Sequence, residues 1–176
     1  MPSRAPKSSK QRGGSGKPKG GKLVRAAVQK ASAKPVVRNN DLPEVTIKVK
    51  RKSMHARAQF DRKMNALKKL SDEGKLFKQA NPVARDETIT KGYKARIRQK
   101  IFDKYWPHDK KLSNKLTERL RLQQPDHVWE LQLGGPDDVS NLKLLHGDTN
   151  RDVGQQIWQQ IMKLPDGTPI RIEVVD

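Results

Sequence analysis

The chain has 176 residues, which is enough for one small domain with or without a tail. Its 38 Lys and Arg residues outnumber 19 Asp and Glu residues, so the formal net charge is +19. Such an excess favours a polyanionic partner, either nucleic acid or an anionic membrane surface. Because the chain lacks Cys and any long apolar run, we expect no disulfide bond, no transmembrane helix and no signal peptide.

The first 40 residues differ in composition from the rest of the chain. They contain 11 Lys and Arg, no Asp or Glu and no aromatic residue. Such a segment buries too little apolar surface to fold alone. We therefore predict a disordered basic arm or linker over residues 1–43 and a folded domain over residues 44–176. An arm would bind nucleic-acid phosphates without sequence preference, whereas a linker would need no ligand.

Three helices are predicted before residue 123, after a strand at residues 45–49 (VTIKV), where apolar and polar side chains alternate. The helices cover residues 55–79, 88–105 and 109–122, and Gly74 interrupts or ends the first. His55 and His108 are expected at the surface. The apolar positions expected to face the core are Phe60, Met64, Leu67 and Leu70 in the first helix, Tyr93, Ile97, Ile101 and Phe102 in the second, and Leu112, Leu116 and Leu120 in the third.

The second half of the chain is predicted to form a strand, a loop, a strand and a helix over residues 125–163. An apolar run begins after Asp126-His127, and Gly134-Gly135-Pro136 breaks it with a turn. A second strand starts at Leu142, and a helix starts at Thr149 with Asp148 as its N-cap. Trp158 and Met162 of this helix are expected in the core. A last strand at residues 170–175 alternates like residues 45–49, so the two are expected to pair. The fold class is therefore α+β.

Four polar residues of this half have a characteristic spacing. Asp126-His127 is followed by Asn141 fourteen residues after the His, and by Asn150 nine residues further on. With the Gly-Gly turn and the Asn150-Arg151 pair opening a helix, this pattern resembles the HNH (ββα-metal) endonucleases. HNH domains at the C-termini of bacterial polymorphic toxins are also similar to this chain in the sequence pattern LQLGG…SNLKLL…TNRDVGQQI. The resemblance implies an HNH core over residues 122–163.

The resemblance also implies a role for each motif residue. His127 would be the general base that takes a proton from the attacking water, and Asn141 would brace the loop that orients it. Asp126 and Asn150 would hold one divalent cation. A carboxylate and an amide oxygen are hard ligands, which suits Mg²⁺ or Mn²⁺. Because there is no Cys, no structural zinc site of the CxxC kind is expected.

Further candidates flank the motif. His146 and Glu130 could belong to the site, but each is also a common residue of turns and exposed strands. The basic residues near the motif could contact phosphates or could be ordinary solvated charges. These candidate nucleic-acid contacts are Arg119, Arg121, Lys143 and Arg151.

Three functions are compatible with these features. The first is a nonspecific DNase toxin acting in the cytoplasm of a target bacterium, delivered by a carrier or secretion machinery and neutralised by an acidic immunity protein. The second is an intracellular HNH nuclease of the restriction or mobile-element type. The third is a basic nucleic-acid-binding protein without catalytic activity, in which the motif is accidental.

Overall fold

Two strands from opposite ends of the domain lie side by side. In the computed structural model, which describes residues 36–79 and 85–175, β1 (Val45–Lys50) pairs in parallel with β4 (Ile170–Val175). The register places Ile47 opposite Ile172. The predicted pairing is confirmed. Both strands alternate buried and exposed side chains along most of their length, because one face of this two-stranded sheet covers the core.

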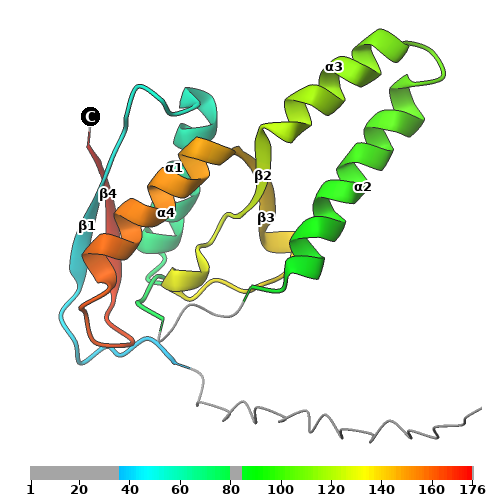
Figure 1. Cartoon of the computed structure of the whole chain (residues 1–176). Coiled ribbons are helices and arrows are strands. Elements are labelled where there is room, and N and C mark those ends of the chain that lie inside the picture. The colour runs from blue at the N-terminus through cyan, green and yellow to red at the C-terminus, as the bar shows by residue number, and fades with distance from the viewer. Residues whose placement is uncertain (1–35, 80–84, 176) are drawn as a thin grey trace, which may run out of the picture. The chain divides into compact units, whose positions relative to one another are not determined.

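Two helices pack on this sheet. Helix α1 (Arg57–Asp72) contacts β4, and helix α4 (Gly147–Ile161) contacts β1 (Figure 1). Helix α1 ends just before Gly74, as the sequence predicted, because this glycine adopts a left-handed backbone with φ of 65°. The shared core consists of Ile47, Val49, Phe60, Met64, Leu67, Leu76, Leu133, Val153, Ile157, Ile161, Ile170 and Ile172.

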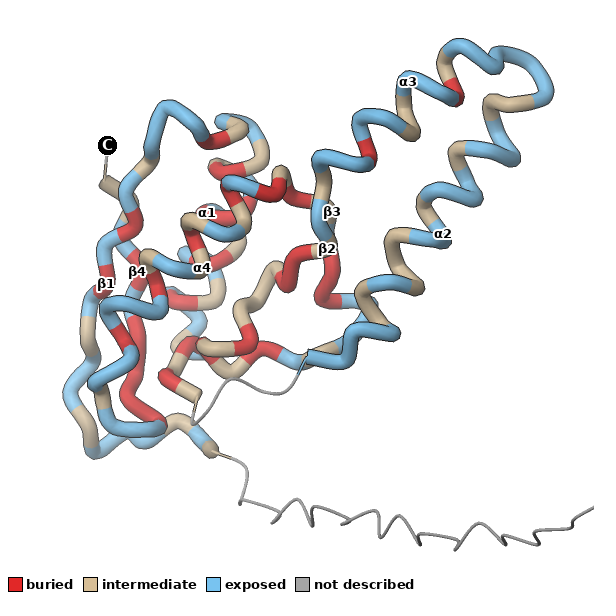
Figure 2. The backbone as a smooth tube through the Cα atoms, in the orientation of Figure 1, coloured by how far each residue is buried: buried red, intermediate tan, exposed pale blue. Residues whose placement is uncertain are grey.

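Helices α2 (Glu87–Tyr105) and α3 (Lys110–Arg121) form an antiparallel hairpin. Each begins at an aspartate whose side chain accepts a backbone hydrogen bond, Asp86 from Thr88 N and Asp109 from Leu112 N. Figure 2 shows α2 in tan and pale blue, without a buried residue. The predicted burial of its apolar positions is therefore wrong. Besides each other, α2 and α3 pack mainly against β2 and the η2 turn, so most of their surface stays exposed or half-buried.

The strand, loop, strand and helix order of the second half is confirmed. Strand β2 (Gln123–His127) pairs antiparallel with β3 (Leu142–His146), with His127 opposite Leu142. The apolar run from Val128 to Leu133 is not a strand, contrary to prediction. It belongs to a loop with two short 3-10 turns, η1 (Leu131–Leu133) and η2 (Val139–Asn141), and Leu133 still reaches the core.

The start and outer face of α4 also differ from the prediction. His146, not Asp148, is the N-cap residue, because the helix follows β3 without an intervening loop. Trp158 and Met162 are exposed, since the core side of α4 is filled by Val153, Ile157 and Ile161. Each helix of the described ranges is too short or too polar to cross a bilayer. The fold is α+β, as predicted.

The compact unit begins earlier than expected. It spans Lys34–Asp176, and Asn39 N donates to the carbonyl of Gly167 at 2.9 Å. The segment around residues 37–42 therefore belongs to the fold. Most of the predicted basic arm, residues 1–35, lies outside the described residues.

Candidate functional site

His127 ends β2 with its side chain enclosed by the protein. Its side chain is 1% exposed, and Nε2 lies 2.7 Å from Oδ1 of Asp137. An ionised carboxylate can only accept a hydrogen bond, so Nε2 is the protonated nitrogen. Nδ1 is buried and has no hydrogen-bond partner within the described segments. The imidazole is therefore held by one nitrogen and keeps a lone pair on the other.

Asp137 connects His127 to the hairpin. Its second oxygen, Oδ2, accepts a hydrogen bond of 2.6 Å from the backbone N of Asp86, the N-cap residue of α2. The carboxylate thus spans two elements that are distant in the sequence. A carboxylate that holds one imidazole nitrogen fixes both the tautomer and the orientation of the ring.

Asn141 holds together the loop between His127 and β3. Its side-chain Oδ1 accepts from Trp129 N at 2.8 Å, while Nδ2 donates to the carbonyls of Trp129 at 2.8 Å and Pro136 at 2.9 Å. Its own carbonyl accepts from Val128 N at 2.8 Å. The oxygen and both N–H groups of the Asn141 side chain thus form hydrogen bonds within this loop, which also carries Asp137.

Asp126 points to different partners from its neighbour His127. Both of its oxygens accept hydrogen bonds from Lys63 Nζ of α1, at 2.9 and 3.0 Å. The same ammonium lies 2.8 Å from Glu130 and also contacts the carbonyl of His127. Glu130, a further candidate from the sequence, is therefore an ion-pair partner of Lys63.

The three charges of this cluster shift one another. Burial raises the pKa of Asp126 to about 6, Lys63 opposes that shift, and the like charge of Glu130 adds to it. Burial alone would lower the pKa of Lys63, but Glu130 and Asp126 together raise it above its usual value. One ammonium between two carboxylates leaves a net negative charge in a poorly solvated place, which favours retention of a proton by Asp126.

Each of the two expected metal ligands contacts another residue of the protein. Asn150 Nδ2 donates to Gln124 Oε1 at 3.0 Å, and both oxygens of Asp126 accept from Lys63 Nζ. The described segments also lack a group of three or more His, Cys, Asp or Glu residues suited to a metal ion. As arranged, with both Asp126 oxygens on Lys63, these residues do not fit a divalent cation.

The remaining candidates lie on β3, α3 and α4. His146 is half-buried, and its Nδ1 lies 3.9 Å from Asp148, too far for a hydrogen bond. Lys143 is exposed and lines a pocket of about 220 Å³ with Asp126. Arg119 lines a groove between α1 and the hairpin. Arg121 pairs with Glu118 at 3.0 Å and Arg151 with Asp148 at 3.5 Å, both on exposed surfaces.

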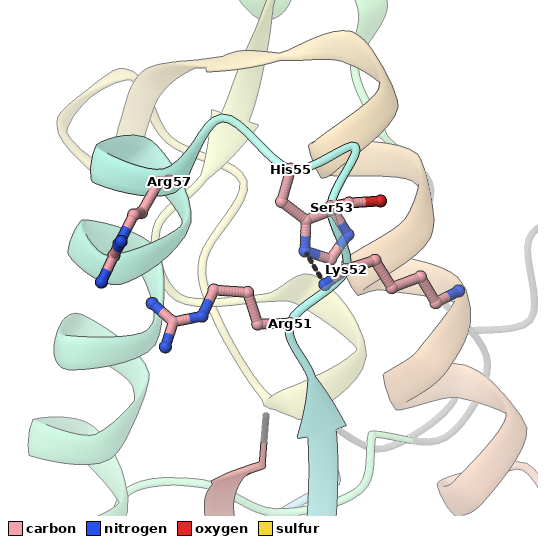
Figure 3. Close-up of a pocket in the computed structure, with 5 residues that line it drawn as sticks. All are labelled: Arg51, Lys52, Ser53, His55 and Arg57. Carbon is pink, nitrogen blue, oxygen red and sulfur yellow. Dashed lines mark hydrogen bonds between the residues drawn. The ribbon is translucent and has the colours of Figure 1, made fainter.

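A second pocket lies at the loop between β1 and α1. Figure 3 shows its lining residues: Arg51, Lys52, Ser53, His55 and Arg57. Arg51 extends toward α1, where it pairs with Asp61 at 3.2 Å, and Lys52 extends toward α4, where it pairs with Asp152. The prediction that His55 is a surface residue is wrong. Its ring is buried because Nε2 lies 2.9 Å from Asp152 and the ring stacks on Phe60.

Sequence reasoning missed Lys63, Asp137 and Gln124. Lys63 had a readable signal, because it falls among Phe60, Met64 and Leu67 on the buried stripe of α1. A lysine there needs buried anionic partners. Asp137 and Gln124 had none, since their contacts depend on the hairpin register and the loop path.

Comparisons with known proteins add nothing to this geometry: no family model, curated protein or solved structure matches the chain.

Proposed function

We propose that this chain is an HNH-type endonuclease that hydrolyses phosphodiester bonds in DNA, with His127 as the general base. One observation carries the proposal: the buried imidazole is held through Nε2 by Asp137 and has no partner on Nδ1 among the described residues. A general base needs a fixed ring and an unoccupied lone pair. The positive charge of the chain supports a phosphodiester substrate.

The residues of the chain supply the proton transfer. Nδ1 of His127 takes a proton from water and the resulting hydroxide attacks phosphorus. The bond from phosphorus to the leaving oxygen breaks, and that oxygen leaves with the electron pair and takes a proton from solvent. Asp137 stabilises the imidazolium that forms, and the Asp86 N–H keeps that carboxylate in place. Asn141 holds the loop on which Asp137 lies.

A divalent cation is implied by the resemblance to HNH endonucleases alone. Asp126 could bind one only after Lys63 leaves its oxygens. Mg²⁺ or Mn²⁺ dependence therefore remains a proposal, tested by adding EDTA to a cleavage assay and then restoring each ion. Restoration by Zn²⁺ alone would contradict the assignment of a hard, oxygen-liking metal.

Plasmid nicking by the wild type and by His127→Ala tests the central role. We expect the variant to lose about 10²- to 10⁴-fold in rate, the usual contribution of a general base, while binding DNA as well as the wild type. Circular dichroism would show that the variant is folded. A folded His127→Ala protein with full nicking activity would refute the proposal.

Asp137→Asn tests whether Asp137 orients the ring of His127 or only holds the loop in place. To keep the hydrogen bond from Asp86 N, the new amide must turn its oxygen toward Asp86 and its NH₂ toward His127. Nε2 must then accept, which puts the ring proton on Nδ1 and blocks the base. We expect a fall of about 10- to 100-fold in kcat with KM unchanged, and partial recovery in Asp137→Glu. A change in KM alone would contradict this role.

A non-catalytic nucleic-acid-binding protein is the second candidate. It is favoured by the pairing of Asp126 with Lys63, which occupies both oxygens of that candidate ligand. Such a protein would bind DNA and leave it intact in Mg²⁺ or Mn²⁺.

A role as a toxin between bacteria rests on the resemblance and on the basic surface, which would suit an acidic immunity protein. Expression of the wild type and His127→Ala in bacterial cytoplasm tests it. Growth arrest with loss of DNA in the wild type alone supports the toxin, and harmless expression of an active nuclease supports an intracellular enzyme.

A further inference from the structure

The α2–α3 hairpin carries much charge and contributes little to the core. Residues 87–121 contain 11 Lys and Arg but only four Asp and Glu. No residue of α2 is buried, and only Ser113 and Leu120 of α3 are. A surface with charge of one sign raises the local concentration of ligands of the opposite sign. The hairpin is therefore a surface for an anionic partner.

A pocket of about 400 Å³ lies between the two helices. Lys94 and Arg98 are one turn apart on α2, and Thr117 and Arg121 are one turn apart on α3, so each pair shares a helix face. Leu120 is the only apolar residue among the five that line this pocket. Three cationic side chains and a hydroxyl thus converge on one hollow.

The cationic groups of this pocket differ in their partners. Lys94 Nζ donates to the carbonyl of Gln123 at 2.6 Å. Arg121 pairs with Glu118, but both are exposed, and such pairs contribute little and exchange readily. Arg98 has no hydrogen bond or ion pair anywhere in the described ranges. Its guanidinium therefore offers a planar set of donors that matches two oxygens of a phosphate.

We propose that this pocket binds a backbone phosphate of the nucleic acid, at a distance from the bond that is cleaved. The lining favours a phosphate over a protein surface, because protein interfaces centre on buried apolar or aromatic groups and this pocket has one leucine. The distance from the cleaved bond rests on the proposed function, whereas phosphate binding itself does not.

Two contacts fix the pocket relative to His127. Helix α2 is tied to His127 through Asp86 and Asp137, and it is tied to the start of β2 through Lys94 and Gln123. Gln123 and His127 stand at opposite ends of β2, about 13 Å apart along the strand. The pocket phosphate is therefore a different one from the phosphate at His127.

The test is fluorescence anisotropy of a labelled DNA duplex, in EDTA, with every protein in the His127→Ala background. Arg98→Gln removes a pocket donor, and Arg96→Gln is the matched control: the same charge change on the same helix, exposed and outside the pocket. We expect Arg98→Gln to bind several-fold more weakly at 50 mM salt and Arg96→Gln to bind like its parent. Loss of one phosphate contact lowers the salt slope by about 0.9, so the gap should shrink about threefold by 200 mM.

Equal losses in the two variants would overturn the proposal, because they would show a response to net charge alone. A competitor separates the partner classes. Polyglutamate and unlabelled DNA of matched charge are compared as competitors for the labelled duplex. If polyglutamate competes as well as unlabelled DNA, and if Arg98→Gln weakens polyglutamate binding as much as DNA binding, the pocket recognises acidic protein and the proposal fails. Since no cleavage occurs in this assay, its outcome does not depend on whether His127 is catalytic.

Discussion

Burial raises the pKa of Asp126 and pairing with Lys63 lowers it, and burial has the larger effect. Its pKa is raised to about 6 in the folded protein, against an ordinary value of 3.8. Between these values the folded state keeps a proton that the unfolded state has released. The resulting stabilisation is complete below pH 3.8 and is lost as the pH rises through 6. Two pH units correspond to about 3 kcal/mol, as an order of magnitude.

Asp126→Asn should remove this dependence, because the amide is neutral at every pH. We expect the free energy of unfolding of the wild type, measured relative to Asp126→Asn, to fall by about 2 kcal/mol between pH 4 and pH 6.5. Urea unfolding in EDTA at several pH values would measure it. Carboxylates away from the cluster of Asp126, Lys63 and Glu130 titrate alike in both proteins and cancel in the difference. A difference that does not vary with pH would show that Asp126 is ionised throughout.

The candidate residues that could be predicted from the sequence are those set by spacing along the chain. The interval from His127 to Asn141 locates the loop that Asn141 braces, because the contacts of that amide are local. Lys63 and Asp137 could not be paired with their partners in this way. Their contacts cross 63 residues in one case and depend on a turn of ten residues in the other.

The loop between β2 and β3 depends on a glycine. A Cβ added at Gly135 would lie 2.1 Å from the carbonyl oxygen of Trp129, and a backbone atom cannot move aside as a side-chain end can. We therefore expect Gly135→Ala to distort the loop and to cost about 1–3 kcal/mol of unfolding free energy. If the loop orients Asp137, nicking activity should fall with it.

Gly154→Ala is the matched control for that substitution. Gly154 lies within α4, and a Cβ there would have no atom within 4 Å. Alanine is the better helix former, so this variant should gain about 0.5–1 kcal/mol. Urea midpoints of both variants would measure the two effects. A Gly135→Ala protein as stable as the wild type would contradict the close approach of the loop to Trp129.

Among the elements, prediction succeeded where a face of the element meets the core. The alternation in residues 45–50 and 170–175 located both strands and their pairing, because one side of each is buried. It failed for Val128–Leu133, an apolar run that forms a loop. The side chain of Asn141 and the Gly-Gly turn draw that chain away from the ladder, and hydrophobicity alone does not distinguish a buried loop from a strand.

For the whole molecule, part of the positive charge lies outside the compact unit. Nine of the 38 Lys and Arg residues precede Lys34, and none of the Asp and Glu residues does. The compact unit Lys34–Asp176 thus has 29 basic and 19 acidic residues. Composition predicts a polyanionic partner for the chain, but the packing of α2 on α3 was needed to locate the cationic pocket between them.

Replacing the nine basic residues before Lys34 with Gln tests how much these residues contribute to nucleic-acid binding, while the chain length stays the same. We expect the temperature of unfolding to stay that of the full chain, because the replaced residues lie outside the compact unit. The salt slope of duplex binding should fall by as much as about 8, at about 0.9 per phosphate contact. Anisotropy titrations at several salt concentrations and a thermal scan measure both. An unchanged slope would show that duplex binding belongs to the compact unit alone, and a lowered unfolding temperature would show that these residues support its fold.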